Sequence, residues 1–121
     1  MYKSEELQKE RERKLKEQER SDREQWEIDV EKIRQNRVRK LRETFPEVNI
    51  DLEKVPEGTD IYTKAKRDIF YFYEARLRDM GRDIKDYGQE FDRNKVNEGM
   101  LKKLKELVLH LERRQVERIK R

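Results

Sequence analysis

Side chains that could act as a nucleophile, a general base or a metal ligand are scarce in this chain of 121 residues. It has no cysteine, its serines are Ser4 and Ser21, and its one histidine is His110. A zinc site usually takes three or four His, Cys or carboxylate ligands, so His110 cannot form one alone. It also lies off the apolar stripe of its segment, which favours an ordinary surface histidine. We therefore expect no enzyme activity, no catalytic residue, and no metal or organic cofactor.

Carboxylates are abundant, but nearly every one has a lysine or arginine close by in the sequence, as on solvated helix faces. Asp92, Asn94 and Asn97 have some likeness to a calcium loop. However, Val96 stands where a third oxygen ligand is needed, and Gly99 is misplaced for the glycine of such a loop. The chain has neither a GxGxxG motif nor a P-loop, so no nucleotide site is expected.

Two clusters of cations could instead contact the phosphates of a nucleic acid. They are Lys32, Arg34, Arg37, Arg39, Lys40 and Arg42, and, near the C-terminus, Arg113, Arg114 and Arg118. Such binding would be electrostatic and strongly dependent on salt. Against it, the net charge is only +4, residues 46–60 are acidic, and cations late in a helix complement its dipole. We expect solvated basic faces, with RNA contacts as the alternative.

The run from Ile69 to Tyr73 places five bulky apolar or aromatic side chains in succession within a chain that is 50% charged. On a helix these side chains point in all directions, so one neighbouring helix cannot cover them. Phe70 and Tyr71 fall off the main apolar stripe, and exposed aromatic residues are typical anchors of protein interfaces. Together with Trp26, these two residues form the predicted partner interface.

The elements that must position these residues are helices. The chain is 32% hydrophobic, with four glycines and two prolines, which is typical of long helices and coiled coils. So small an apolar fraction cannot fill the wide core of a compact globule. We expect an all-α fold in an elongated, coiled-coil-like arrangement of three helices.

A long first helix is predicted because residues 4–45 contain neither Gly nor Pro, and Pro46 ends the run. Residues 1–24 form a solvated, charged extension, supported by i,i+4 pairs of acidic and basic side chains. The helical module 25–121 follows and begins with a helix over 25–45. Its apolar face is expected to pack against the rest of the module and consists of Trp26, Val30, Ile33, Leu41 and Phe45.

Residues 46–58 are predicted to be an extended loop, followed by Thr59 or Asp60 as a helix cap. A continuous apolar stripe then favours one helix over 59–93, and a helix end at Gly81 or Gly88 is the alternative. A third helix over 97–121 is capped by Asn94 or Asn97.

A short connection between the second and third helices predicts an antiparallel helical hairpin. Arg76 lies within the apolar arc of the second helix. We therefore expect it to pair with an acid such as Glu112 or to stack on an aromatic ring.

These observations lead to three functional hypotheses. The first is a non-enzymatic adaptor or scaffold subunit that contacts other proteins in a larger assembly. The second is an RNA-binding component of a ribonucleoprotein complex, of the splicing or ribosome-assembly type. The third is a self-associating coiled-coil protein, in which a homodimer covers the surplus aromatic surface.

The same composition limits where the protein acts. The absence of cysteine fits a reducing compartment, so we expect the nucleus or the cytoplasm. No apolar run approaches the roughly 20 residues that a membrane span needs, and the N-terminal segment is too acidic for a transit peptide. We expect no membrane partner.

Overall fold

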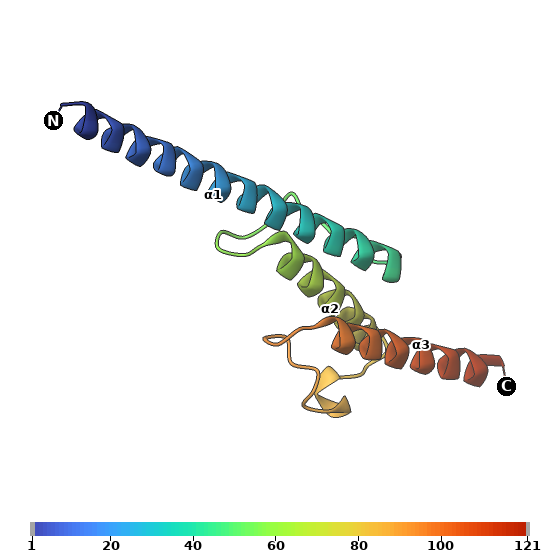
Figure 1. Cartoon of the computed structure of the whole chain (residues 1–121). Helices are drawn as coiled ribbons and strands as arrows, with labels where there is room; N and C mark the ends of the chain where they lie inside the picture. Colours follow the sequence, from blue (N-terminus) through green and yellow to red (C-terminus); the bar gives the residue numbers. More distant parts are fainter. Residues whose placement is uncertain (1, 121) are drawn as a thin grey trace. The chain divides into compact units, whose positions relative to one another are not determined.

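In the computed structural model the described residues are 2–120, with side chains described for residues 4–119. They form α1 (Tyr2–Thr44), α2 (Ile61–Asp79), the short 3₁₀ helix η1 (Ile84–Tyr87) and α3 (Glu98–Lys120) (Figure 1). No strand occurs within residues 2–120, so the predicted all-α arrangement of three helices is confirmed over that range. The expected element ends at residues 1 and 121 lie outside the described residues.

The chain divides into two compact units, residues 1–36 and residues 37–121. Unit 1 is helical from Tyr2, and none of its side chains from residue 4 to residue 36 is buried. Gln18 donates a hydrogen bond to Asp22, and Gln25 donates one to Asp29, each at 3.0 Å. Such i,i+4 pairs support a helix that has little packing of its own.

Unit 2 contains the hydrophobic core. Its largest fully buried side chains are Tyr73, Phe45, Phe70, Ile69, Leu77, Leu101, Leu104 and Val108. Val48 and Ile50, from the segment between α1 and α2, join this cluster, as does Ile84 of η1. Residues outside the three α-helices therefore contribute to the same core as α2.

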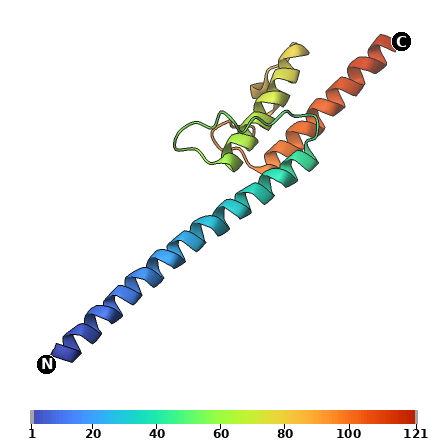
Figure 2. The ribbon, with the colours of Figure 1, turned by 90° about the horizontal axis from the view of Figure 1, so that it is seen from above.

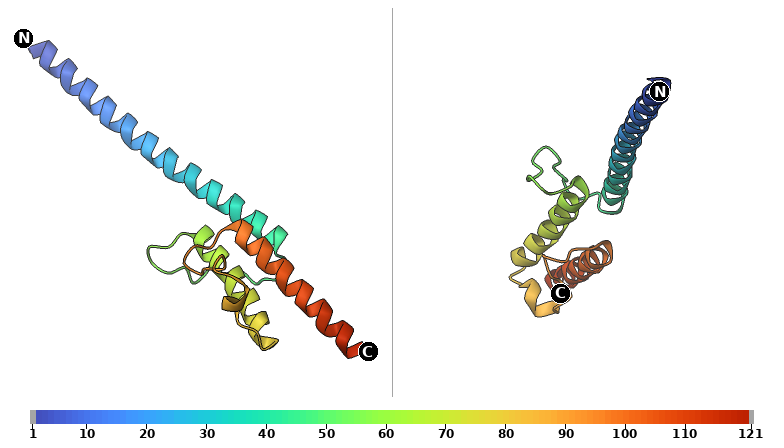
Figure 3. Two further views of the ribbon diagram at one scale, coloured as in Figure 1. Left: turned by 90° about the horizontal axis from the view of Figure 1, so that it is seen from below. Right: turned by 60° about the vertical axis from the view of Figure 1, so that its left-hand side comes forward.

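Helices α2 and α3 run in the same direction, not antiparallel as expected (Figures 2 and 3). The hydroxyl of Tyr62 donates to Glu98 near the start of both helices, and Arg76 donates to Glu112 further along both. Each pair is separated by 36 residues in sequence, which is the pattern of parallel neighbours. The reason is that residues 80–97 form a long crossover connection, and only a short turn forces antiparallel packing.

Helix α2 ends at Asp79. The predicted single helix over 59–93 is therefore wrong, and the alternative, a helix end at Gly81, is the one observed. Gly81 has φ +72°, in the left-handed region that favours glycine. Its N–H donates to the carbonyl of Arg78 at 2.9 Å, and the N–H of Arg82 donates to that of Leu77 at 2.9 Å. This is a Schellman motif, which satisfies the last carbonyl groups of the helix.

The starts of α2 and α3 have side-chain caps. Asp60 Oδ1 accepts a hydrogen bond from the N–H of Thr63 at 2.8 Å. Asn97 Oδ1 accepts one from the N–H of Met100, also at 2.8 Å. Each cap satisfies a backbone donor that has no partner within its helix.

Arg76 has the pairing expected from its place in the apolar arc. Its guanidinium contacts Glu112 through two nitrogens, one of them Nε at 2.7 Å, and contacts Glu47 through Nη1 at 2.5 Å. It also lies 5.5 Å from the centre of the Phe72 ring. Arg76 therefore joins α2, α3 and the segment after α1 through one side chain.

Candidate functional site

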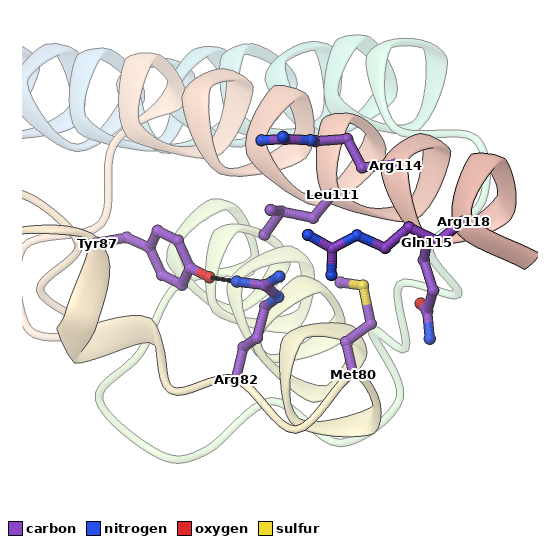
Figure 4. Close-up of a pocket in the computed structure, with 7 residues that line it drawn as sticks. All are labelled: Met80, Arg82, Tyr87, Leu111, Arg114, Gln115 and Arg118. Carbon is purple, nitrogen blue, oxygen red and sulfur yellow. Dashed lines mark hydrogen bonds between the residues drawn. The ribbon is translucent and has the colours of Figure 1, made fainter.

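A cavity of about 390 Å³ lies in unit 2 near the end of α2 (Figure 4). Its lining residues, which we call the arginine pocket, are Met80, Arg82, Tyr87, Leu111, Arg114, Gln115 and Arg118. The first three come from the end of α2, the turn after it, and η1, and the other four come from α3. The pocket thus exists because two separate parts of the chain meet.

Local structure explains how each side chain reaches the arginine pocket. The left-handed turn at Gly81 directs the chain away from the α2 axis, so that Arg82 lies at the edge of the cavity. Its Nη1 donates to the hydroxyl of Tyr87 at 2.6 Å. On α3, Leu111, Arg114 and Arg118 are three, four and seven positions apart, which places them on one helix face.

The lining of the arginine pocket is cationic. It includes three guanidinium groups, and no carboxylate is among its described lining residues. Glu112, which is adjacent to Leu111 in sequence, is bound to Arg76 instead. Among the described residues Arg114 and Arg118 have no ion-pair partner. The site is therefore suited to an anion.

The sequence predicted only part of this pocket. Arg114 and Arg118 were expected as possible phosphate contacts, and both line it, whereas Arg113 is exposed and does not. Arg82 and Tyr87 were not expected, because they are remote from α3 in sequence. Only the parallel packing of α2 and α3 brings them beside it.

The first basic cluster is divided between the two units. Lys32 and Arg34 belong to unit 1, whereas the remaining four cations belong to unit 2. Of those four, Arg37 lies over the ring of Tyr62, 5.4 Å from its centre, and Arg42 donates to the carbonyl of Ile50 at 3.2 Å. Arg39 and Lys40 are exposed. Intramolecular partners thus account for part of this cluster.

The predicted aromatic interface is only partly available. Phe70 is 1% exposed and belongs to the core, so the expectation that its ring points outward is wrong. Val48, Ile50 and Ile84 belong to the same buried cluster as Phe70, together with residues of α1 and α3. Tyr71 is 46% exposed and packs edge-on against Phe70, with ring centres 6.0 Å apart.

Unit 1 presents a stripe of apolar side chains on α1. Trp26, Val30 and Ile33, which we call the Trp26 stripe, are spaced i, i+4 and i+7 and so share one helix face. Trp26 is 64% exposed and Ile33 is 51% exposed, although both were expected to pack against the rest of the module. The buried part of α1 begins only at Val38.

Within the described part of the chain, no three His, Cys, Asp or Glu side chains lie together as metal ligands would. His110 is exposed. No described helix combines the length and the apolar character needed to cross a lipid bilayer.

The fold and these two surfaces define an all-α protein with an exposed apolar helix face and a separate cationic pocket. No protein-family model, curated protein or solved structure matches this chain. No activity or partner of a known protein therefore transfers to it, and its function follows from its own side chains.

Proposed function

We propose that this protein is a non-enzymatic helical adaptor that mediates protein–protein contacts in a larger assembly. The observation that supports this most directly is the exposure of Trp26, at 64%, on the Trp26 stripe. Single apolar residues at a surface are ordinary, but a large apolar patch on a charged helix is typical of an interaction site. Tryptophan is also among the residues most often found as interface anchors.

The spacing of the stripe suggests how it binds. Anchors at i, i+4 and i+7 are those of an amphipathic helix that lies in an apolar groove of another protein. Arg23 and Asp29, three positions before and after Trp26, are exposed beside the stripe and would supply the polar rim of the contact. The partner in this proposal is a folded protein with an apolar groove.

The stripe can be tested with full-length tagged protein captured from cell extract, in parallel samples with and without nuclease. Trp26→Ala with Ile33→Ala should reduce recovery of the partner, with affinity falling at least about tenfold, as for loss of an interface anchor. Alanine keeps the helix propensity, so circular dichroism should be unchanged. The readout is the amount of each copurified protein, followed by the affinity of the purified pair.

Ile28→Ala is the matched control. Ile28 is 49% exposed on the same helix, but two positions from Trp26, which places it on the opposite face. Its loss should leave partner recovery unchanged. Equal losses for Ile28→Ala and for the stripe variant would show general hydrophobic adhesion and contradict the proposal.

Two alternative functions give different results in the same experiment. Partners that disappear on nuclease treatment would support a ribonucleoprotein component, for which the unpaired Arg114 and Arg118 are the specific observation. A self-associating coiled coil would place a second copy on the stripe. Sedimentation would then show a dimer that Trp26→Ala dissociates.

A further inference from the structure

We propose that the arginine pocket binds the phosphate group of a phosphorylated side chain on a partner protein. This inference rests on the adaptor proposal only in that a partner protein supplies the phosphate. The arginine pocket belongs to unit 2 and the Trp26 stripe to unit 1, so each surface can be changed without the other.

The charge of the pocket is the first argument. Three guanidinium groups gather around one cavity, and the described lining residues include no carboxylate to neutralise them. By contrast, Arg76, which has a structural role, forms ion pairs with both Glu47 and Glu112. Like charges that share a site repel one another, and a bound anion would relieve that repulsion.

The helix dipole does not explain the whole cluster. Arg114 and Arg118 lie in the later part of α3, where cations are favourable without any ligand. Arg82 does not share that position, since it follows the end of α2 and is directed by the turn at Gly81. Figure 4 shows the Arg82 side chain on the opposite wall of the cavity from α3, bonded to Tyr87. Two independent elements thus contribute cations to one space.

The donors of the pocket match a phosphate monoester. Guanidinium groups bind phosphate oxygens through paired N–H donors, and clusters of arginines are the usual recognition element for phosphorylated side chains. The Gln115 amide and the Tyr87 hydroxyl lie in the same lining as further polar groups. A phosphate monoester has a charge of about −1.5 to −2 near neutral pH, which suits three cations better than a single carboxylate does.

The size and surroundings of the pocket favour a side chain over a nucleic acid. A cavity of about 390 Å³ exceeds the needs of a bare phosphate, and Met80 and Leu111 add apolar walls for the group that bears it. A nucleic-acid groove would continue the positive charge along the strand. Here Asp79, Asp83 and Asp86 lie within four residues of Arg82 in sequence, so this segment contains no continuous run of positive charge.

The test is a titration of the full-length protein with the N-acetyl amides of phosphotyrosine and phosphoserine, followed by NMR of the arginine Nε–H groups. Signals from Arg82, Arg114 and Arg118 should shift together and saturate. Arg114→Gln with Arg118→Gln should weaken binding at least about tenfold, because two charged hydrogen-bonding groups are lost. Comparison of the two probes identifies the preferred phosphorylated residue.

Arg113→Gln is the matched control, since Arg113 is exposed on the same helix but does not line the pocket. It should change the affinity less than about twofold, as expected for a peripheral charge. Arg118→Lys keeps the charge but loses the paired donors, so it should also weaken binding, and it serves as a conservative second variant.

Three results would overturn the proposal. The first is that unphosphorylated N-acetyltyrosine amide binds as tightly as the phosphotyrosine amide, and the second is that Arg113→Gln weakens binding as much as Arg114→Gln with Arg118→Gln. The third is that oligouridylate binds more tightly than either phosphorylated amide and depends on the same arginines. The last would make the pocket an RNA contact. Trp26→Ala should leave phosphate binding intact, so failure of the Trp26 stripe and failure of the arginine pocket give separate results.

Discussion

At the scale of single residues, the hydroxyl of Tyr62 is the clearest source of a pH-dependent stability. It donates to Glu98 at 2.8 Å and joins the starts of α2 and α3. Burial, and next the hydrogen bond to the Glu98 carboxylate, raise the pKa of Tyr62 from 10 to about 12. The folded protein therefore retains this proton at pH values where the unfolded chain, with a pKa near 10, loses it.

The sign of the effect follows from this difference in pKa. The contribution of Tyr62 to the free energy of unfolding should be full below pH 10 and should be lost as the pH rises from 10 to about 12. Tyr62→Phe keeps the ring near Lys66 and removes the hydroxyl, so it should lower the free energy of unfolding by about 1 kcal/mol at neutral pH. Urea denaturation of both proteins across this pH range is the measurement.

The difference between wild type and Tyr62→Phe should shrink above pH 10. Tyr71→Phe is the control for loss of a hydroxyl, because the Tyr71 ring is 46% exposed and its substitution should leave the free energy of unfolding nearly unchanged at neutral pH. A difference that stays constant up to pH 12 would mean that the hydroxyl of Tyr62 does not contribute through its proton.

At the scale of elements, Gly81 determines where α2 ends. A Cβ added at this position would meet no atom within 4 Å, so the effect of a substitution comes from the backbone alone. Gly81→Ala must adopt a φ near +72° and should lower the free energy of unfolding by about 1 kcal/mol. Gly81→Asn should cost less, because asparagine tolerates the left-handed region.

Thermal or urea unfolding with circular dichroism measures both variants. The sign of the change for Gly81→Ala is decisive. If the chain instead formed one helix over 59–93, alanine would remove a helix-breaking residue and would increase both helicity and stability. Such an increase would contradict the end of α2 at this glycine.

At the scale of the whole molecule, stability should reside in unit 2. No side chain among residues 4–37 is buried, and the core begins at Val38. A fragment of residues 25–121 should therefore unfold cooperatively, with a free energy of unfolding within about 0.5 kcal/mol of the full chain, as for exposed sites in general. Urea denaturation of both chains is the comparison, and a much less stable fragment would show that residues 1–24 contribute to the fold.

How much of the arginine pocket could be predicted differs between its two walls. Arg114 and Arg118 belong to one visible cluster in the sequence, and helical spacing places them together. Arg82 stands alone, and its place in the pocket depends on the left-handed turn at Gly81 and on the direction of α3. Phe70 was misplaced for a related reason, since the buried cluster to which it belongs also contains residues outside the long helices, such as Val48 and Ile50, whose path has no periodic signal.

The helices and their caps could be predicted from the sequence because they obey local rules. The helix run up to Thr44 and the caps at Asp60 and Asn97 follow from spacing and backbone donors, and the place of Arg76 in an apolar arc predicted that it would need an acidic or aromatic partner. The end of α2, the parallel direction of α3, the burial of Phe70 and the gathering of three arginines came from tertiary packing. The physical reason is the separation in sequence between the residues that interact. A cap or an apolar stripe depends on neighbours within a few residues. The path of residues 80–97 depends instead on which apolar surfaces, distant in sequence, it can bury.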